Sequence, residues 1–162
     1  DYIVFHSQIN PWINEPRIRR LNNSMQKEFW EEVFSDTDCF QGTILIENIF
    51  EDDPILLKEL MDTINLPNMK VCLDVGHARL SKDIDDWVKV LKDNIEYMHI
   101  HWNGGLYDDH LKPSDENIMY IAEVLKKYDI SSHLALEYDV NDVEDEVKRI
   151  RKILSFVDKE VI

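Results

Sequence analysis

Five apolar runs in this chain each end on an ionisable side chain. Uninterrupted apolar runs of this length are typical of strands buried on both faces, as in a parallel sheet. An α/β barrel builds its active site at the carboxyl ends of such strands, and His, Asp and Glu are side chains that hold divalent metals. The runs are Ile3-Val4-Phe5-His6, Ile44-Leu45-Ile46-Glu47, Val71-Cys72-Leu73-Asp74, Met98-His99-Ile100-His101 and Leu134-Ala135-Leu136-Glu137.

Segments with helical periodicity separate these runs. We expect helices over residues 25–34, 54–64, 83–91, 116–128 and 143–157, because their apolar residues recur three or four positions apart. This order predicts an α/β fold with a parallel sheet, as an open doubly wound sheet or as part of a closed barrel. The four glycines form neither GxGxxG nor GxxxxGK[ST], which favours a barrel-like site made by side chains. We expect residues 1–162 to form a single domain.

Composition limits the partners and the compartment. Acidic residues outnumber basic ones 33 to 18, for a net charge of -15, which argues against a general nucleic-acid binder because that function needs a cationic face. The two cysteines, Cys39 and Cys72, stand in different settings and do not suggest a disulfide framework. No run approaches the roughly 18 apolar residues of a membrane span. We expect a soluble, cytoplasmic protein with no membrane partner.

The segment Asp74-Val75-Gly76-His77 is the first candidate motif. A carboxylate at a strand end and an imidazole three residues later can both turn into the mouth of a site, and Gly76 permits a tight bend between them. The alternative interpretation is structural, with Asp74 as a helix cap and His77 as a loop histidine. The sequence leaves both interpretations open.

The second motif runs from His99 to His110. Alternate residues of a strand share a face, so His99 and His101 point the same way, with His101 nearer the carboxyl end. After the turn, Asp108 and His110 offer a second ligand pair. We interpret His101, Asp108 and His110 as metal ligands and His99 as a core histidine, and we expect Trp102 to wall a substrate pocket.

Glu47 and Glu137 complete the candidate set. A glutamate at the end of an apolar strand is costly to bury unless something offsets its charge, and a metal ion does so directly. Two glutamates across one pocket can also exchange protons with a substrate carbon, one as base and one as acid. A buried salt bridge is the competing explanation, although no strand ends on Arg or Lys.

These motifs resemble, in order, those of the xylose isomerase-like TIM barrels, which include sugar and sugar phosphate isomerases or epimerases and endonuclease IV. The resemblance rests on Leu45-Ile46-Glu47-Asn48, on Cys72 to Ala78, on His99 to Leu111 and on Leu136-Glu137. It implies a (β/α)8 TIM barrel of which this chain carries only the fourth to eighth strands with their helices. The missing units would then be supplied by a longer protein, a complementing chain or a homo-oligomer.

The resemblance also implies roles for single residues. Glu47, Asp74, His101 and Glu137 match the four ligands of one divalent metal in the ketose epimerases, where the two glutamates also form the catalytic acid/base pair. In endonuclease IV these places are joined by His6, His77, Asp108 and His110, which resemble further ligands of a zinc cluster. We place the substrate-contacting residues at the strand ends and in the loop after the fourth run: His6, His77, Trp102 and Asn103.

The leading functional prediction is therefore a metal-dependent isomerase or epimerase of a small sugar or sugar phosphate, with Mn, Zn, Mg or Co as cofactor. The alternatives are an endonuclease IV-like zinc phosphodiesterase acting on abasic DNA and a non-catalytic barrel fragment. The acidic net charge and the loop 104–107, which carries no cation, argue against the nuclease. The segment 112–116 departs from the glycine-rich turn of both branches, so its substrate contact is not carried over.

Overall fold

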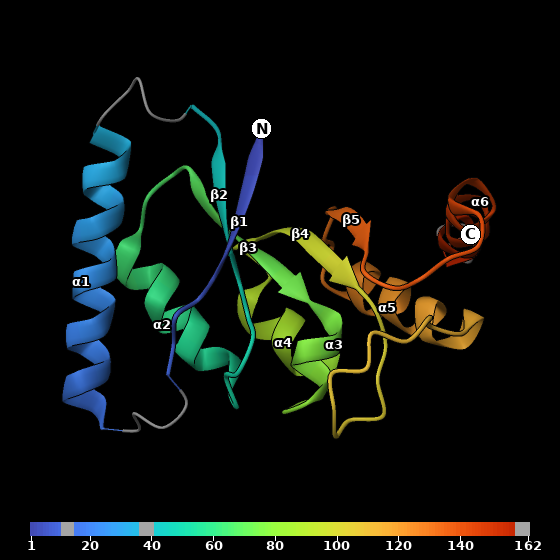
Figure 1. Cartoon of the computed structure of the whole chain (residues 1–162), viewed down its shortest axis with the longest axis horizontal. Coiled ribbons are helices and arrows are strands. Elements are labelled where there is room, and N and C mark those ends of the chain that lie inside the picture. The colour runs from blue at the N-terminus through green and yellow to red at the C-terminus, as the bar shows by residue number, and fades with distance from the viewer. Residues whose placement is uncertain (11–14, 36–40, 158–162) are drawn as a thin grey trace.

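The computed structural model describes residues 1–10, 15–35 and 41–157 of the chain. Strands and helices alternate through these residues, as the sequence predicts (Figure 1). The strands are β1 (Tyr2–His6), β2 (Thr43–Glu47), β3 (Met69–Asp74), β4 (Ile95–Ile100) and β5 (His133–Leu136). The helices are α1 (Pro16–Ser35), α2 (Pro54–Ile64), α3 (Val75–Arg79), α4 (Ile84–Leu91), α5 (Asp115–Lys127) and α6 (Val143–Val157).

The five strands form one parallel sheet in the order β1-β2-β3-β4-β5. A doubly wound sheet reverses its strand order at a switch point, and this sheet does not. When every crossover steps in the same direction, all helices come to lie on one side of the sheet. The helices accordingly pack in an arc, α1 on α2, α2 on α4, α4 on α5 and α5 on α6 (Figure 1). This is half of a TIM barrel, and the predicted fold class is confirmed.

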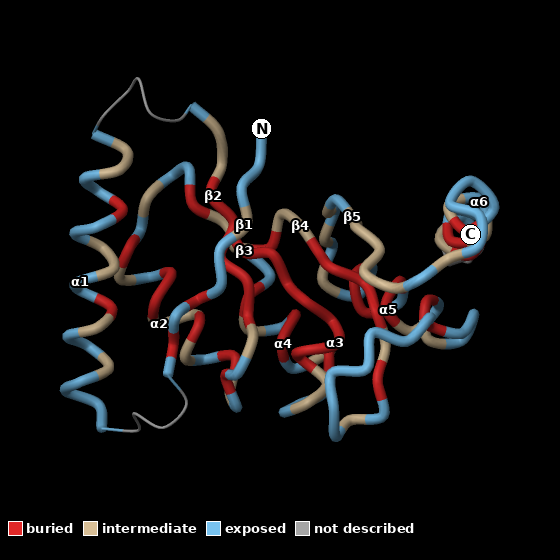
Figure 2. The backbone as a smooth tube through the Cα atoms, viewed as in Figure 1, coloured by how far each residue is buried: buried red, intermediate tan, exposed pale blue. Residues whose placement is uncertain are grey.

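The hydrophobic core lies between the sheet and the helix layer (Figure 2). Successive residues of a strand point to opposite faces, and the outward-facing positions of the three central strands are buried against the helices. Burial of this apolar surface is the main force that holds the two layers together. The outward-facing residues are Ile44, Ile46, Val71, Leu73, Met98 and Ile100.

The same alternation directs the other residues of the strands to the inner face of the sheet. Glu47, Asp74 and His99 lie there, at the carboxyl ends of β2, β3 and β4. The central strands are largely buried, whereas four of the five residues of β1 are exposed. The fold therefore presents polar side chains on the inner face and leaves an open edge at β1.

Local side-chain contacts decide where helices begin. Helix α1 starts at Pro16, nine residues before the start that the apolar spacing predicts, because the Glu15 carboxylate accepts hydrogen bonds from the backbone N–H groups of Arg17 and Ile18. An acceptor at this place satisfies N–H groups that have no partner inside the helix. Pro16 then occupies a first-turn position where its missing N–H costs nothing. Helix α2 starts as predicted, at Pro54 after the capping side chain of Asp53.

The remaining sequence expectations concern cysteines and membrane spans. Cys72 is a buried free thiol on β3, and burial together with the nearby Glu47 carboxylate raises the pKa of this thiol. Cys39 lies outside the described residues. Among the helices of the described ranges, none has the length and apolar content needed to cross a bilayer.

Candidate metal centre

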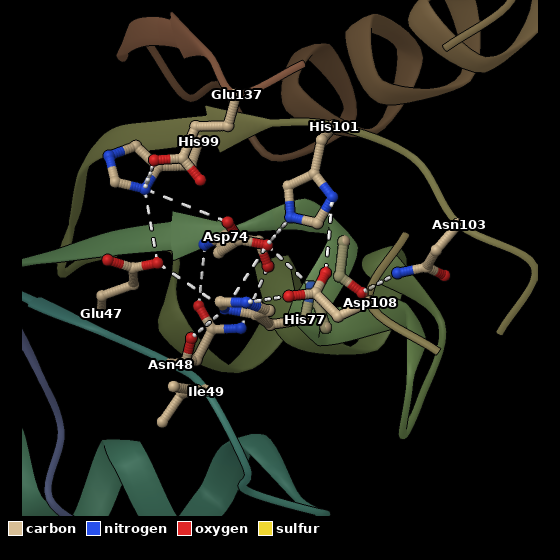
Figure 3. A network of polar contacts seen from close by, with 12 residues as sticks. Glu47, Asn48, Ile49, Asp74, His77, His99, His101, Asn103, Asp108 and Glu137 are labelled. Atoms are coloured by element: carbon tan, nitrogen blue, oxygen red, sulfur yellow. Dashed lines mark hydrogen bonds and ion pairs between the residues drawn. The ribbon is translucent and has the colours of Figure 1, made fainter. Parts of the chain in front are cut away.

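The carboxyl ends of the strands bring a set of acidic and imidazole side chains together on the inner face (Figure 3). They form two groups, and within each group one ligand atom per residue lies within 4.8 Å of all the others. We call the first group the glutamate cluster: Glu47, Asp74, His99 and Glu137. We call the second group the histidine cluster: His77, His101, Asp108 and His110.

His99 is the centre of the glutamate cluster. Its Nδ1 lies 3.0 Å from Oε1 of Glu137, 3.3 Å from Oε1 of Glu47 and 3.9 Å from Oδ2 of Asp74. Burial disfavours the charged imidazole, but the nearby carboxylate of Glu47, with the charges of Glu137 and Asp74, outweighs it and raises the pKa of His99. The three carboxylates that surround Nδ1 of His99 thus favour a positive charge among them.

Asp74 carries the clearest sign of a missing partner. Its Oδ1 accepts hydrogen bonds from the backbone N–H of His77 at 2.7 Å and from Nε2 of His101 at 2.9 Å. Its Oδ2 is buried without a hydrogen-bond partner, although buried polar atoms are nearly always paired. Burial raises the pKa of Asp74, but the bond to His101 and the charge of His77 overcome this and lower it. An ionised carboxylate with one free buried oxygen fits a metal ligand.

Glu137 differs from Glu47 in exposure. The Glu47 side chain is 6% exposed and that of Glu137 is 33% exposed. Burial raises the pKa of Glu137, the charge of His99 opposes it, and the charges of Asp74 and Glu47 raise it further, for a net increase. A carboxyl group whose pKa is moved toward neutrality suits proton transfer.

The histidine cluster is built around Asp108. Nε2 of His77 and Nε2 of His110 both lie 3.1 Å from its Oδ2, and Nδ1 of His101 lies 3.6 Å from its Oδ1. The rings of His101 and His110 stack, with centroids 4.0 Å apart. His110 holds this position at a φ of +47°, which non-glycine residues seldom adopt and which is often found at functional sites.

Backbone carbonyls fix the orientation of two of these imidazoles. Nδ1 of His77 lies 2.9 Å from the carbonyl oxygen of Asn48, and Nδ1 of His110 lies 2.8 Å from that of Glu137. A carbonyl oxygen only accepts, so both Nδ1 atoms carry the proton, and both Nε2 atoms face Asp108. Burial lowers the pKa of each imidazole, but nearby carboxylates and these carbonyls raise both on balance. A histidine ligand is commonly held this way, with its second nitrogen donating to a carbonyl.

His101 links the two clusters. It is fully buried, and its ring reaches Asp74 with one nitrogen and Asp108 with the other. All seven residues that the sequence predicts as metal ligands lie in one cluster or the other. The structure places His99 between the two glutamates, where the resemblance expects His101, and His101 one step further toward the histidine cluster.

The predicted substrate contacts are distributed differently. His77 belongs to the histidine cluster, and the half-exposed His6 reaches to 4.0 Å from Glu47. Trp102 lies outside both clusters, and its ring stacks under the guanidinium of Arg79 at 3.7 Å. Asn103 is buried and binds backbone, donating to the carbonyl of Gly76 and accepting from the N–H of Gly105.

Two residues of the site are missed by the sequence interpretation. His99 is taken there for a core histidine, and Asn48 is assigned no role of its own. The Asn48 side chain pairs with the backbone of Asp74 in both directions, at 3.0 and 2.8 Å, and so fixes the strand end that carries the Asp74 ligand atom. An asparagine directly after a strand-end glutamate is the signal that could have identified it.

Comparison with known proteins decides the family. Residues 2–159 match the model of the xylose isomerase-like TIM barrel family. The chain belongs to this family. An uncharacterized protein of Methanocaldococcus jannaschii is 29% identical over an alignment of 162 positions, which covers 94% of this chain and 59% of that protein.

Solved structures agree on the fold. A D-tagatose 3-epimerase-like protein superposes with a TM-score of 0.77 at 22% identity, over 100% of this chain and 65% of its own. A Thermus thermophilus protein, from crystals soaked in zinc chloride, gives 0.71 at 21% identity, over 96% of this chain and 62% of its own. These identities establish the barrel alone. The chain thus spans about 60% of the length of its relatives.

Proposed function

We propose that this protein is a metal-dependent isomerase or epimerase of a small sugar or sugar phosphate, which moves a proton on a carbon next to a carbonyl. The observation that carries the proposal is the glutamate cluster. Two glutamates from strand ends separated by β3 and β4 converge there with one aspartate and one histidine. Membership of a family that contains sugar isomerases supports the substrate class.

The donor set fits a divalent cation. Three carboxylates and an imidazole suit Mn²⁺, Zn²⁺, Mg²⁺ or Co²⁺, and the unpartnered Oδ2 of Asp74 supplies a buried oxygen for it. Glu47, Asp74, His99 and Glu137 are the residues that would hold the ion. When bound, such an ion polarises a carbonyl and an adjacent hydroxyl.

The protein residues perform the proton transfer. One of the two glutamates removes the proton next to the carbonyl and the other returns a proton, so that no external base is needed. The imidazole of His99 lies between the two glutamates and contacts both. His77 and His6 lie near Glu47, where they are placed to contact substrate hydroxyls or a phosphate.

Solvent exchange tests this proposal directly. The protein is incubated with each divalent metal and a panel of ketoses and ketose phosphates in heavy water, and deuterium at the carbon next to the carbonyl is measured by NMR. We expect incorporation with at least one sugar, loss of it in Glu47→Gln, and retention in Glu123→Gln, which changes an exposed glutamate of α5. No incorporation with any metal and sugar refutes the proposal.

A zinc phosphodiesterase acting on abasic DNA is the second candidate. The histidine cluster favours it, because it offers a further set of ligands beside the glutamate cluster. The net charge of -15 argues against it, since DNA binding requires neutralisation of phosphates by cations. Metal analysis separates the two: several zinc ions per chain support the nuclease, and a single exchangeable divalent ion supports the isomerase.

An unpartnered apolar surface bears on whether the chain acts alone. Phe5 of β1 and Leu21, Met25 and Phe29 of α1 are each at least 44% exposed. In a closed barrel this edge is covered by a neighbouring βα unit. We expect further βα units to cover it, from the same polypeptide, a complementing chain or a second copy. If the purified chain is monomeric and binds no metal, the non-catalytic alternative holds.

A further inference from the structure

Glu146 on α6 is a buried carboxylate that belongs to neither cluster. Only 4% of the surface of Glu146 is exposed. Oε1 accepts from the hydroxyl of Tyr138 at 2.8 Å and from Arg149 at 2.6 and 3.0 Å, and Oε2 accepts from Nζ of Lys112. A buried carboxylate is costly unless it is paired and hydrogen-bonded, and these donors meet that cost. The proposed reaction gives this buried charge no role.

Two of the donors to Glu146 lie close in sequence to residues of the two clusters. Tyr138 directly follows Glu137, and Lys112 follows His110 by two residues. Through Tyr138, Glu146 is linked to Glu137 of the glutamate cluster, and through Lys112 it is linked to His110 of the histidine cluster. Glu146 makes both contacts from the helix layer, where α6 packs against α5.

Lys112 stands at the base of the loop that carries Asp108 and His110. The loop is closed by an antiparallel bridge between Trp102 and Leu111, with N···O distances of 2.8 Å in both directions. Lys112 is the next residue after that bridge, so the Glu146 contact anchors the point where the loop returns to the body of the protein.

Arg149 extends the same anchor. Its guanidinium contacts Asp115 and donates to the carbonyl of Pro113 at 3.0 Å, in addition to its bonds with Glu146. The two anchored segments are also joined on the inner side, where Nδ1 of His110 donates to the carbonyl of Glu137. The loop and the strand end are thus tied together twice, once inside the site and once behind it.

We infer that Glu146 is a positioning residue that holds Glu137 where it binds metal and His110 where it joins the histidine cluster. The inference rests on the proposed function only in that Glu137 is taken as a ligand. Ligand side chains must be held within about 0.5 Å of the productive geometry. Losing an outer partner of a metal ligand typically lowers affinity by about 10- to 100-fold.

The test compares two carboxylate-to-amide variants. Glu146→Gln removes the charge that binds Lys112 and Arg149. Asp85→Asn is the matched control, because Asp85 also accepts from a lysine and a tyrosine, Lys127 and Tyr128, and links α4 to α5 away from both clusters. Affinity for Mn²⁺ and Co²⁺ is measured by calorimetry, and the visible spectrum of the Co²⁺ form reports its coordination.

We expect Glu146→Gln to lose about 10- to 100-fold in affinity and to shift the Co²⁺ spectrum, with Asp85→Asn unchanged in both. Should Glu146→Gln not fold, Tyr138→Phe removes one hydroxyl donor only and is expected to lower the affinity in the same direction. Affinity and spectrum equal to the parent protein in the folded variant overturn the inference. A parent protein that binds neither metal overturns it as well.

The outcomes separate this inference from the proposed function. Metal binding that depends on Glu146, without deuterium exchange into any sugar, supports the positioning role and contradicts the isomerase. Deuterium exchange in a protein whose metal affinity is indifferent to Glu146 contradicts the positioning role alone.

Discussion

Gly76 is the position where one added methyl group tests the geometry of the site. A Cβ built on Gly76 lies 1.8 Å from Cε1 of His101 and 2.3 Å from each of its ring nitrogens. Real Cβ atoms essentially never lie within 3.0 Å of another heavy atom of this kind. The His101 ring therefore has to move by at least 1.2 Å, which is the difference between 3.0 and 1.8 Å. His101 is fully buried and bonded to Asp74 at 2.9 Å, so a shift of this size breaks that bond.

The expected cost of Gly76→Ala follows from three terms. Forcing a methyl group into a packed site costs about 1–3 kcal/mol, and losing a hydrogen bond to a charged group costs about 1.5–3 kcal/mol. Gly76 lies in α3, where alanine is better than glycine by roughly 0.5–1 kcal/mol. The unfavourable terms win, and we expect a net loss of roughly 2–5 kcal/mol in the free energy of unfolding.

Chemical denaturation and metal titration measure both effects of this substitution. We expect Gly76→Ala to lose about 10- to 100-fold in divalent metal affinity, because the displaced ring no longer holds Asp74. Gly104→Ala is the control: nothing lies within 4 Å of its added Cβ, so its free energy of unfolding should stay within about 0.5 kcal/mol of the parent. If Gly76→Ala matches this control in stability and in metal affinity, the packing of His101 over α3 is wrong.

Three further predictions concern the carboxylates. Glu137→Gln should lower the rate of deuterium exchange by about 10²- to 10⁴-fold, as expected for loss of an acid/base group; an unchanged rate would exclude Glu137 from proton transfer. Metal at 100 times its Kd should stabilise the protein by about 2.7 kcal/mol in denaturation experiments, and Asp74→Asn should abolish most of this gain. Burial raises the pKa of Glu146, but Arg149, Lys112 and Tyr138 outweigh it and lower this pKa from 4.5 to about 2. The ionised Glu146 therefore contributes fully to the free energy of unfolding above pH 4.5, and this contribution of about 3 kcal/mol is lost as the pH falls toward 2. A series of unfolding curves at different pH values should show this loss in the parent protein and not in Glu146→Gln.

The sequence predicts the layers of this fold because they depend on local patterns. All five strands and the five predicted helices are present, and the sheet is parallel, since apolar runs alternate with amphipathic segments throughout. The early start of α1 is missed because it depends on Glu15, a residue that is not among the usual capping types. The short helix α3 is also missed, since its five residues are too few for a periodic pattern.

The site is predicted less completely, because its composition depends on how strands are aligned. Every predicted metal ligand lies at a strand end, in the loop after β4 or, for His77, in the short helix α3 that follows β3, at the end of the sheet where a barrel collects its functional side chains. The protein contacts of Trp102 and Asn103 could not be read from their neighbourhood in the chain. The Trp102 ring packs against the guanidinium of Arg79, and Asn103 holds the loop to α3 through the carbonyl of Gly76.

The position of His99 shows where a single sequence stops being informative. Val71 pairs with Ile95, but the next residue, Cys72, pairs with Tyr97, so the register between β3 and β4 shifts by one residue. Without this bulge Asp74 would lie beside Met98, which points to the helices; with it, Asp74 lies beside His99. A shift of one residue exchanges the two faces of a strand, and neither strand's own pattern encodes it. Which histidine joins the two glutamates is therefore a property of the pairing between β3 and β4, and only a structure can assign it.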